Sequence, residues 1–106
     1  MSTGTSSVFA ARLKQARIAA GISQRALGMA LGYPPDSASP RMNQYEQGKR
    51  EPGLATARQI AVQLGIPLAY LYCEEPDLAD LILRFAKMNA SERASILRSV
   101  ERFQHR

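Results

Sequence analysis

Histidine and cysteine, which serve catalysis and metal binding in many enzymes, are scarce in this chain and form no catalytic pattern. The sequence contains one histidine, His105, and one cysteine, Cys73. A single imidazole beside the C-terminus cannot supply a histidine-based triad or a histidine-rich metal cluster, and a lone cysteine has no second thiolate for zinc. The glycines occur singly and are not grouped as in a phosphate-binding loop. The sequence therefore predicts a protein that is not an enzyme and that uses no metal or cofactor.

The basic side chains are more informative, because they are unevenly distributed. The formal net charge is +5. Residues 1–66 contain eight basic and three acidic residues, whereas residues 67–106 contain six of each. The excess lies in the first two thirds of the chain, where we expect the site for a polyanion. Charge alone leaves a merely solvated basic surface as the alternative.

Composition also predicts the compartment. Residues 1–7 are small and polar, which favours a flexible tail over a signal peptide. No stretch approaches the roughly 18 apolar residues that would span a membrane. The single cysteine cannot form an internal disulfide, in agreement with a reducing compartment. We expect a cytoplasmic protein with no membrane partner.

Apolar residues at helical spacing predict five helices, most of which end at a glycine. The expected ranges are 9–20, 24–31, 40–47, 54–64 and 67–72, and the first four are followed by Gly21, Gly32, Gly48 and Gly65. Ser23 is suited to cap the second helix, and Pro40 to lie in the first turn of the third. Three prolines predict an irregular connecting loop over most of residues 33–40.

Two further amphipathic helices are expected beyond a break at residues 74–76. Their apolar positions are Leu78, Leu81, Ile82 and Phe85 in the first, and Ile96, Leu97, Val100 and Phe103 in the second. No strand pattern occurs in the sequence. The expected fold class is all-α, with a five-helix unit over residues 8–73 and a helical C-terminal extension over residues 77–104.

Four stretches of the sequence resemble the phage-repressor and Cro-like helix-turn-helix family, also called the xenobiotic-response-element (XRE) family. They are RLKQAR at 12–17, AGISQ at 20–24, YEQGKREP at 45–52 and IAVQLGIP at 60–67. Their joint spacing is more specific than any one of them. The resemblance implies a lambda-repressor-like DNA-binding domain whose third helix, the recognition helix, lies in the major groove of double-stranded DNA.

The resemblance also implies which residues contact DNA. The base-reading positions correspond to Ser39, Arg41 and Gln44, with Asn43 beside them and able to reach a base edge or a phosphate. Arginine can form two hydrogen bonds with guanine, and glutamine can do the same with adenine. The residues that match phosphate-binding positions, which add affinity without sequence information, are Gln24, Lys49 and Arg50.

This chain departs from the family in the connection between the second and third helices. Residues 32–42 form a segment about four residues longer than the short turn usual there. The added residues lie beside the groove-facing end of the recognition helix. We expect Asp36, Ser37 and Ala38 either to contact DNA or only to bridge the gap.

Other conspicuous residues are expected to be structural. In the family, the positions of Arg17 and Glu46 form an ion pair between the first and third helices, and direct DNA contact by Arg17 is the alternative. Met42 and Tyr45 lie three residues apart and should face the core, and stacking on DNA bases is the alternative. Gly28 replaces the alanine usual in the family and should permit close helix packing.

Two functions fit this sequence. The first is a transcriptional regulator, in particular a repressor, that binds its operator as a homodimer; the proposed dimer contacts are Leu78, Leu81, Ile82 and Phe85. The second is an interaction protein, such as an antitoxin, that binds a protein partner through its extension and DNA secondarily. The apolar stripe of the extension fits either function, and it could also pack back on the five-helix unit.

Overall fold

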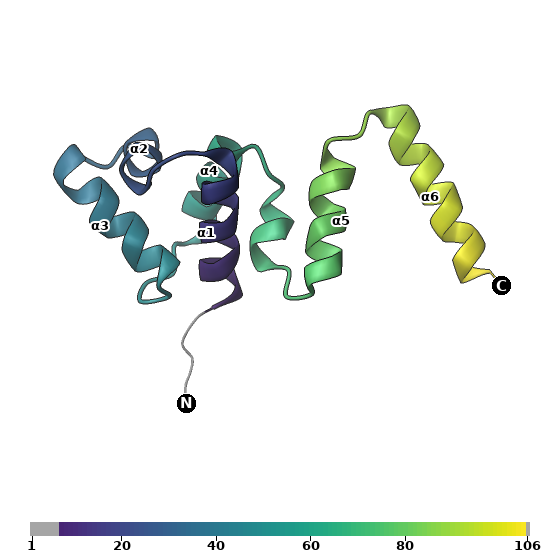
Figure 1. The fold of residues 1–106 in the computed structure, drawn as a ribbon, viewed down its shortest axis with the longest axis horizontal. Helices are drawn as coiled ribbons and strands as arrows, with labels where there is room; N and C mark the ends of the chain where they lie inside the picture. Colours follow the sequence, from purple (N-terminus) through teal and green to yellow (C-terminus); the bar gives the residue numbers. More distant parts are fainter. Residues whose placement is uncertain (1–6, 106) are drawn as a thin grey trace.

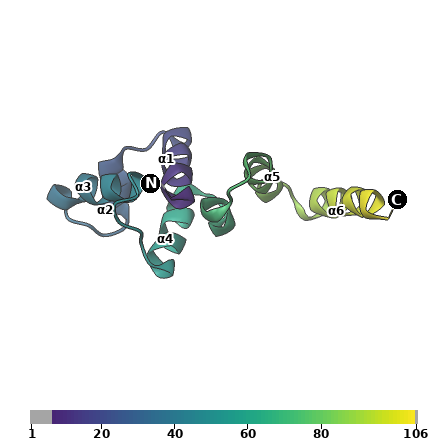
Figure 2. The same cartoon turned by 90° about the horizontal axis from the view of Figure 1, so that it is seen from below.

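The computed structural model describes residues 7–105, and every regular element in that range is helical. The elements are α1 (Val8–Ala20), α2 (Gln24–Ala30), α3 (Pro35–Glu46), α4 (Leu54–Leu64), the 3-10 helix η1 (Leu68–Tyr72), α5 (Pro76–Ala86) and α6 (Ala90–Gln104). The molecule measures 54 × 35 × 22 Å, with α3 near one end of the long axis and α6 at the other (Figures 1 and 2). The all-α fold with a helical extension is therefore confirmed. Of the expected tail, residues 1–6 lie outside the described residues, and Ser7 caps α1 by accepting a hydrogen bond from the Ala10 N–H.

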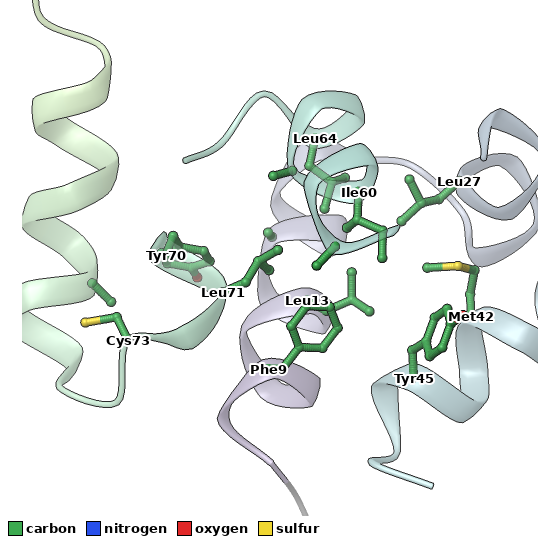
Figure 3. Packing of buried hydrophobic residues seen from close by; sticks show 14 residues of the cluster. Phe9, Leu13, Leu27, Met42, Tyr45, Ile60, Leu64, Tyr70, Leu71 and Cys73 are labelled. Carbon is green, nitrogen blue, oxygen red and sulfur yellow. The ribbon is translucent and has the colours of Figure 1, made fainter. Parts of the chain in front are cut away.

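The core lies where α1 to η1 meet, and Figure 3 shows its packing. Every one of these five elements contributes to it; the largest fully buried side chains are Phe9, Leu13, Leu27, Met42, Ile60 and Leu71. Burying a side chain of this size stabilises the fold by about 1.5–3 kcal/mol. In contrast, α6 contributes no buried residue.

Helices α1 to α4 end at the expected glycines. Gly21, Gly32, Gly48 and Gly65 all have positive φ, between 67° and 99°. At the end of α2, the Gly32 N–H donates to the Met29 carbonyl (3.0 Å) and the Tyr33 N–H donates to the Gly28 carbonyl (3.1 Å), which is the Schellman arrangement. Because Gly32 has φ +99°, a side chain at this position would be strained. The turn therefore fixes the direction in which the chain leaves α2.

The third helix begins at Pro35, so the expectation of an irregular segment up to Pro40 is wrong. Pro34 is the N-cap residue and Pro35 occupies the first turn, where the missing N–H has no helical partner to lose. Pro40 lies inside α3 and deprives the Asp36 carbonyl of its helical donor. Both residues are exposed, so water can satisfy that carbonyl. The long connection is therefore accommodated largely as an additional N-terminal turn of α3.

The additional turn is packed against α2. Ala38 is completely buried, and a Cβ added at Gly28 would lie only 2.7 Å from the Ala38 carbonyl oxygen and 2.8 Å from its Cβ. The expected close packing at Gly28 is confirmed. Ala38 bridges the helices, and its burial excludes the alternative that it contacts DNA.

Helix α5 packs on the core along one face. Ala79 is buried there, and Ile82 and Leu83 are partly buried against the same cluster. Arg12 reinforces the junction, since its Nε donates to the Cys73 carbonyl (2.8 Å) and its Nη2 to the Glu74 carbonyl (3.1 Å). Arg12 therefore has a structural role.

Helix α6 projects beyond α5 and is attached to it through residues of its first turn. A capping box of Asn89 and Glu92 stabilises its N-terminal end. Arg93 donates to the carbonyls of Phe85 (3.1 Å) and Ala86 (3.0 Å), and its guanidinium lies 4.9 Å from the centre of the Phe85 ring. Among residues 7–105, every helix is too short or too polar to cross a lipid bilayer.

Candidate nucleic-acid interface

Helix α3, the expected recognition helix, has a buried face and a polar face. Ala38, Met42 and Tyr45 point into the protein and are at most 4% exposed. Successive residues of an α-helix are about 100° apart, so the residues between these anchors face outward or along the flanks. The four expected base-reading residues lie here and are all partly exposed: Ser39, Arg41, Asn43 and Gln44.

Gln24 at the start of α2 is hydrogen-bonded to one flank of α3. The Ser39 hydroxyl donates to Gln24 Oε1 (3.2 Å), and Gln24 Nε2 donates to Asn43 Oδ1 (3.4 Å) and Glu46 Oε1 (3.1 Å). The structure thus brings together a residue expected to bind phosphate and two residues expected to contact bases. The phosphate contact itself stays a prediction.

Arg17 and Glu46 form an ion pair beneath this network. Arg17 donates from Nε and Nη2 to the two carboxylate oxygens of Glu46, the latter at 3.2 Å, and from Nη1 to the Ile22 carbonyl (3.0 Å). The two side chains are only 14% and 2% exposed. Removing one partner would leave a poorly hydrated charge. This geometry favours the structural role of Arg17 over direct DNA contact.

Arg41 lies on the opposite flank of α3, beside two tyrosines. Its guanidinium carbon is 5.2 Å from the centre of the Tyr33 ring, and the hydroxyls of Tyr33 and Tyr45 are 3.0 Å apart. Burial, followed by the hydrogen bond to Tyr45, raises the pKa of Tyr33 above its ordinary value. Interaction with the Tyr45 hydroxyl is the main cause that raises the pKa of Arg41.

Sequence reasoning missed Tyr33, which was expected only as part of the connecting loop. A signal was present in the residue that follows the helix-ending Gly32. A hydrophobic residue at that position of a Schellman motif commonly packs back on the last turns of the helix that it follows. The motif therefore indicated a packed side chain at Tyr33, but not its contacts with α3.

Gln44, Lys49 and Arg50 complete the polar surface near the C-terminal end of α3. Gln44 is partly exposed, and its carbonyl accepts hydrogen bonds from the N–H groups of Lys49 (3.0 Å) and Arg50 (3.3 Å). These bonds tie the backbone of the two basic residues to the last turn of α3, while their side chains are exposed. Within residues 7–105, no group of three histidine, cysteine or acidic residues could hold a metal ion.

This chain is similar to known proteins in sequence and in fold. A family model described as helix-turn-helix matches residues 13–71. The crystal structure of the transcriptional regulator BswR is similar to this chain with a TM-score of 0.85 and 45% identity, over 88% of this chain and 92% of that one. The likeness to BswR is too long to be confined to residues 13–71, so it extends into the C-terminal part. Comparison with curated proteins found no match.

Proposed function

The chain belongs to the helix-turn-helix family of DNA-binding transcriptional regulators, of the XRE and Cro-like type. We propose that this protein is a repressor that recognises its operator through α3. One observation carries the proposal. A helix anchored by Ala38, Met42 and Tyr45 exposes a continuous polar surface on its other side.

The chemistry of that surface supports recognition of bases in the major groove. Arg41 can donate two hydrogen bonds to the O6 and N7 atoms of guanine, and Gln44 can pair with the N6 and N7 atoms of adenine. Ser39 and Asn43 are oriented by Gln24 and contact neighbouring edges or phosphates. Each of these groups has the donors or acceptors for the role proposed.

Affinity comes from contacts with the DNA backbone. Lys49 and Arg50 are exposed directly after α3, and their charges would displace counterions from phosphates. Gln24 adds a neutral phosphate contact beside them. Repression follows where the bound protein overlaps the polymerase site, because the two proteins cannot occupy the same DNA.

We further propose that a second copy of the chain covers the outer face of α5. Leu78 and Leu81 are 42% and 46% exposed, and they belong to a groove of about 460 Å³ that also includes Ile82, Phe85 and Arg93. Further apolar residues, Leu97 and Val100, are exposed on α6. A two-fold pair of these surfaces buries them and gives two recognition helices for the two halves of an operator.

The same exposed residues favour a second candidate function, in which another protein covers the α5–α6 surface and DNA binding is secondary. The two candidates differ in what the purified protein does. A repressor is complete as a homodimer, whereas an antitoxin-type protein requires its partner to hide the apolar surface. A chain that is monomeric alone and forms a stable complex with one defined second protein would favour the second candidate.

The test of the proposed repressor starts with selection of bound sequences from random duplex DNA by the full-length protein. We expect enrichment of a sequence with two related halves. Placing that sequence across the start of a reporter promoter should lower transcription when the protein is present. Enrichment of no sequence would contradict recognition of bases, and a rise in transcription would contradict repression.

A further inference from the structure

Tyr33 is held rigidly although it lies in the connection between α2 and α3. Its N–H is bonded to the Gly28 carbonyl at 3.1 Å, which fixes the backbone where the side chain starts. Its hydroxyl lies 3.0 Å from the hydroxyl of Tyr45, whose residue is only 4% exposed. The Tyr33 ring is therefore anchored to α2 at one end and to the core at the other.

Arg41 lies over the face of that fixed ring. The distance of 5.2 Å from its guanidinium carbon to the ring centre is within the range of a cation–π interaction. An arginine on an open helix flank has many accessible rotamers, and contact with a fixed aromatic ring reduces their number. Arginine has five N–H donors in a planar fork, so donors remain for a pair of acceptors on a ligand.

The position of Arg41 on the helix separates it from the Gln24 network. Residues 39 and 41 are about 200° apart around α3, and Ser39 is bonded to Gln24 on its own flank. Arg41 therefore has no part in that network and depends on the tyrosine pair for its orientation. One flank of the recognition surface is ordered by a glutamine and the other by Tyr33.

We infer that Tyr33 is a positioning residue for DNA specificity, which holds Arg41 where its fork meets the O6 and N7 acceptors of one guanine. The inference rests on the proposed function, since it assumes that α3 recognises bases. It differs from that proposal in assigning part of the specificity to a residue outside the recognition helix. It also predicts that a substitution of Tyr33 alone lowers the preference for guanine, although Arg41 is still present.

The experiment uses the full-length protein and the DNA sequence that the wild type selects. The first step identifies the guanine that Arg41 contacts. It is the position of the DNA at which Arg41→Ala lowers the preference for guanine over adenine, and we expect a decrease of about tenfold. Tyr33→Leu, which removes the ring, should lose most of the preference at that same base pair. In the Arg41→Ala background, Tyr33→Leu should have little further effect, because the group that it positions is already absent.

Two variants separate positioning from general damage. Tyr33→Phe keeps the ring and should retain most of the preference for guanine. Tyr72→Leu removes another partly exposed tyrosine, which packs on Phe9, and should leave the preference unchanged. Melting curves establish that each variant is folded.

A measurement independent of Tyr33→Leu covers the case in which that variant does not fold. The side-chain Nε–H resonance of Arg41 should be shifted upfield by the ring current in the wild type and in Tyr33→Phe. An unshifted resonance would overturn the inference, as would a folded Tyr33→Leu protein with unchanged preference for guanine. Equal weakening of all sequences by Tyr33→Leu would also overturn it, because Tyr33 would then add to affinity without directing Arg41 to a base. If the wild type selects no sequence at all, the proposed function itself fails.

Discussion

Ser39 and Arg41 have partners within the protein, whereas the side chains of Lys49 and Arg50 extend into solvent from the end of α3. This difference affects what each residue contributes on binding. A side chain that is already ordered loses little conformational entropy when DNA arrives, while a mobile one loses about 0.5–1.5 kcal/mol. Ordered residues are suited to selecting bases, and mobile basic residues are suited to phosphates, whose positions vary little with sequence.

Replacing Gln44 by alanine should reduce sequence preference without affecting folding. Gln44 lies on the polar side of α3 and fills no core position, so Gln44→Ala should change the free energy of unfolding by less than about 0.5 kcal/mol. The lost base contact should reduce discrimination between the operator and scrambled duplex by about 1–3 kcal/mol. Titrations with both duplexes and a melting curve measure the two effects. Gln59→Ala, at an exposed glutamine of α4, is the matched control and should change neither; an unaltered operator preference in Gln44→Ala would exclude Gln44 from base recognition.

Replacing Lys49 and Arg50 together should weaken binding to all sequences about equally. Both side chains are exposed at the end of α3, and loss of two phosphate contacts should lower the slope of log affinity against log salt by about 2. The measurement is a set of affinities at several salt concentrations. Lys87→Ala with Arg98→Ala removes the same charge from the extension and should leave the slope nearly unchanged. If both pairs have equal effects, net charge and not a local contact governs binding.

At the level of helices, the sequence predicted most elements because their signals are local. Four glycines with positive φ end helices at the expected places, and Ser23 caps α2 as expected. The start of α3 was not predictable by the same rules, since Pro40 opposes a helix through residues 35–40. Burial of Ala38 against Gly28, a contact between two helices, outweighs that local preference.

The candidate site was predictable to a similar extent. The family pattern predicted the polar residues of α3, because their positions follow from the helix register. It could not predict the partners of those residues, since the Tyr33 contact with Arg41 and Tyr45 depends on the unusual connection before α3. Contacts made by an inserted segment have no counterpart in a pattern that lacks the insertion.

Gly28→Ala should destabilise the protein although alanine favours helices. Helix propensity alone would stabilise α2 by about 1 kcal/mol. The added Cβ would lie 2.7 Å from the backbone oxygen of Ala38, so the additional turn of α3 would have to shift. We expect a net loss of about 1–3 kcal/mol, measured by denaturant unfolding. The two effects have opposite signs, so a stabilised variant would contradict the close contact between α2 and α3.

At the scale of the whole molecule, the extension is divided between two roles. Ala79, Ile82 and Leu83 of α5 pack on the core, while Leu78 and Leu81 remain exposed. Cutting the chain before α5 would therefore remove core contacts as well as the proposed dimer surface. Substitution of exposed residues is the cleaner way to test assembly.

Leu78→Glu combined with Leu81→Glu should convert the proposed dimer to a folded monomer, because four carboxylates would meet across the two-fold axis. Sedimentation at micromolar concentration measures the assembly, and a melting curve measures folding. The control is Val62→Glu, at a more exposed apolar residue on α4 (76%), which should not alter the assembly. A double variant that is still dimeric would place the interface on another surface.

The charge excess and the elongated shape together affect how the protein approaches DNA. The residues that carry the excess belong to α1–α4 and the loops between them, whereas residues 67–106 are electrically balanced. The centre of charge is therefore displaced from the centre of mass along the 54 Å axis, towards α3 (Figure 1). In the field of a polyanion, this displacement produces a torque that turns the basic end forward before contact. A larger fraction of diffusive encounters then begins in a productive orientation, and that kinetic advantage shrinks as added salt shortens the Debye length.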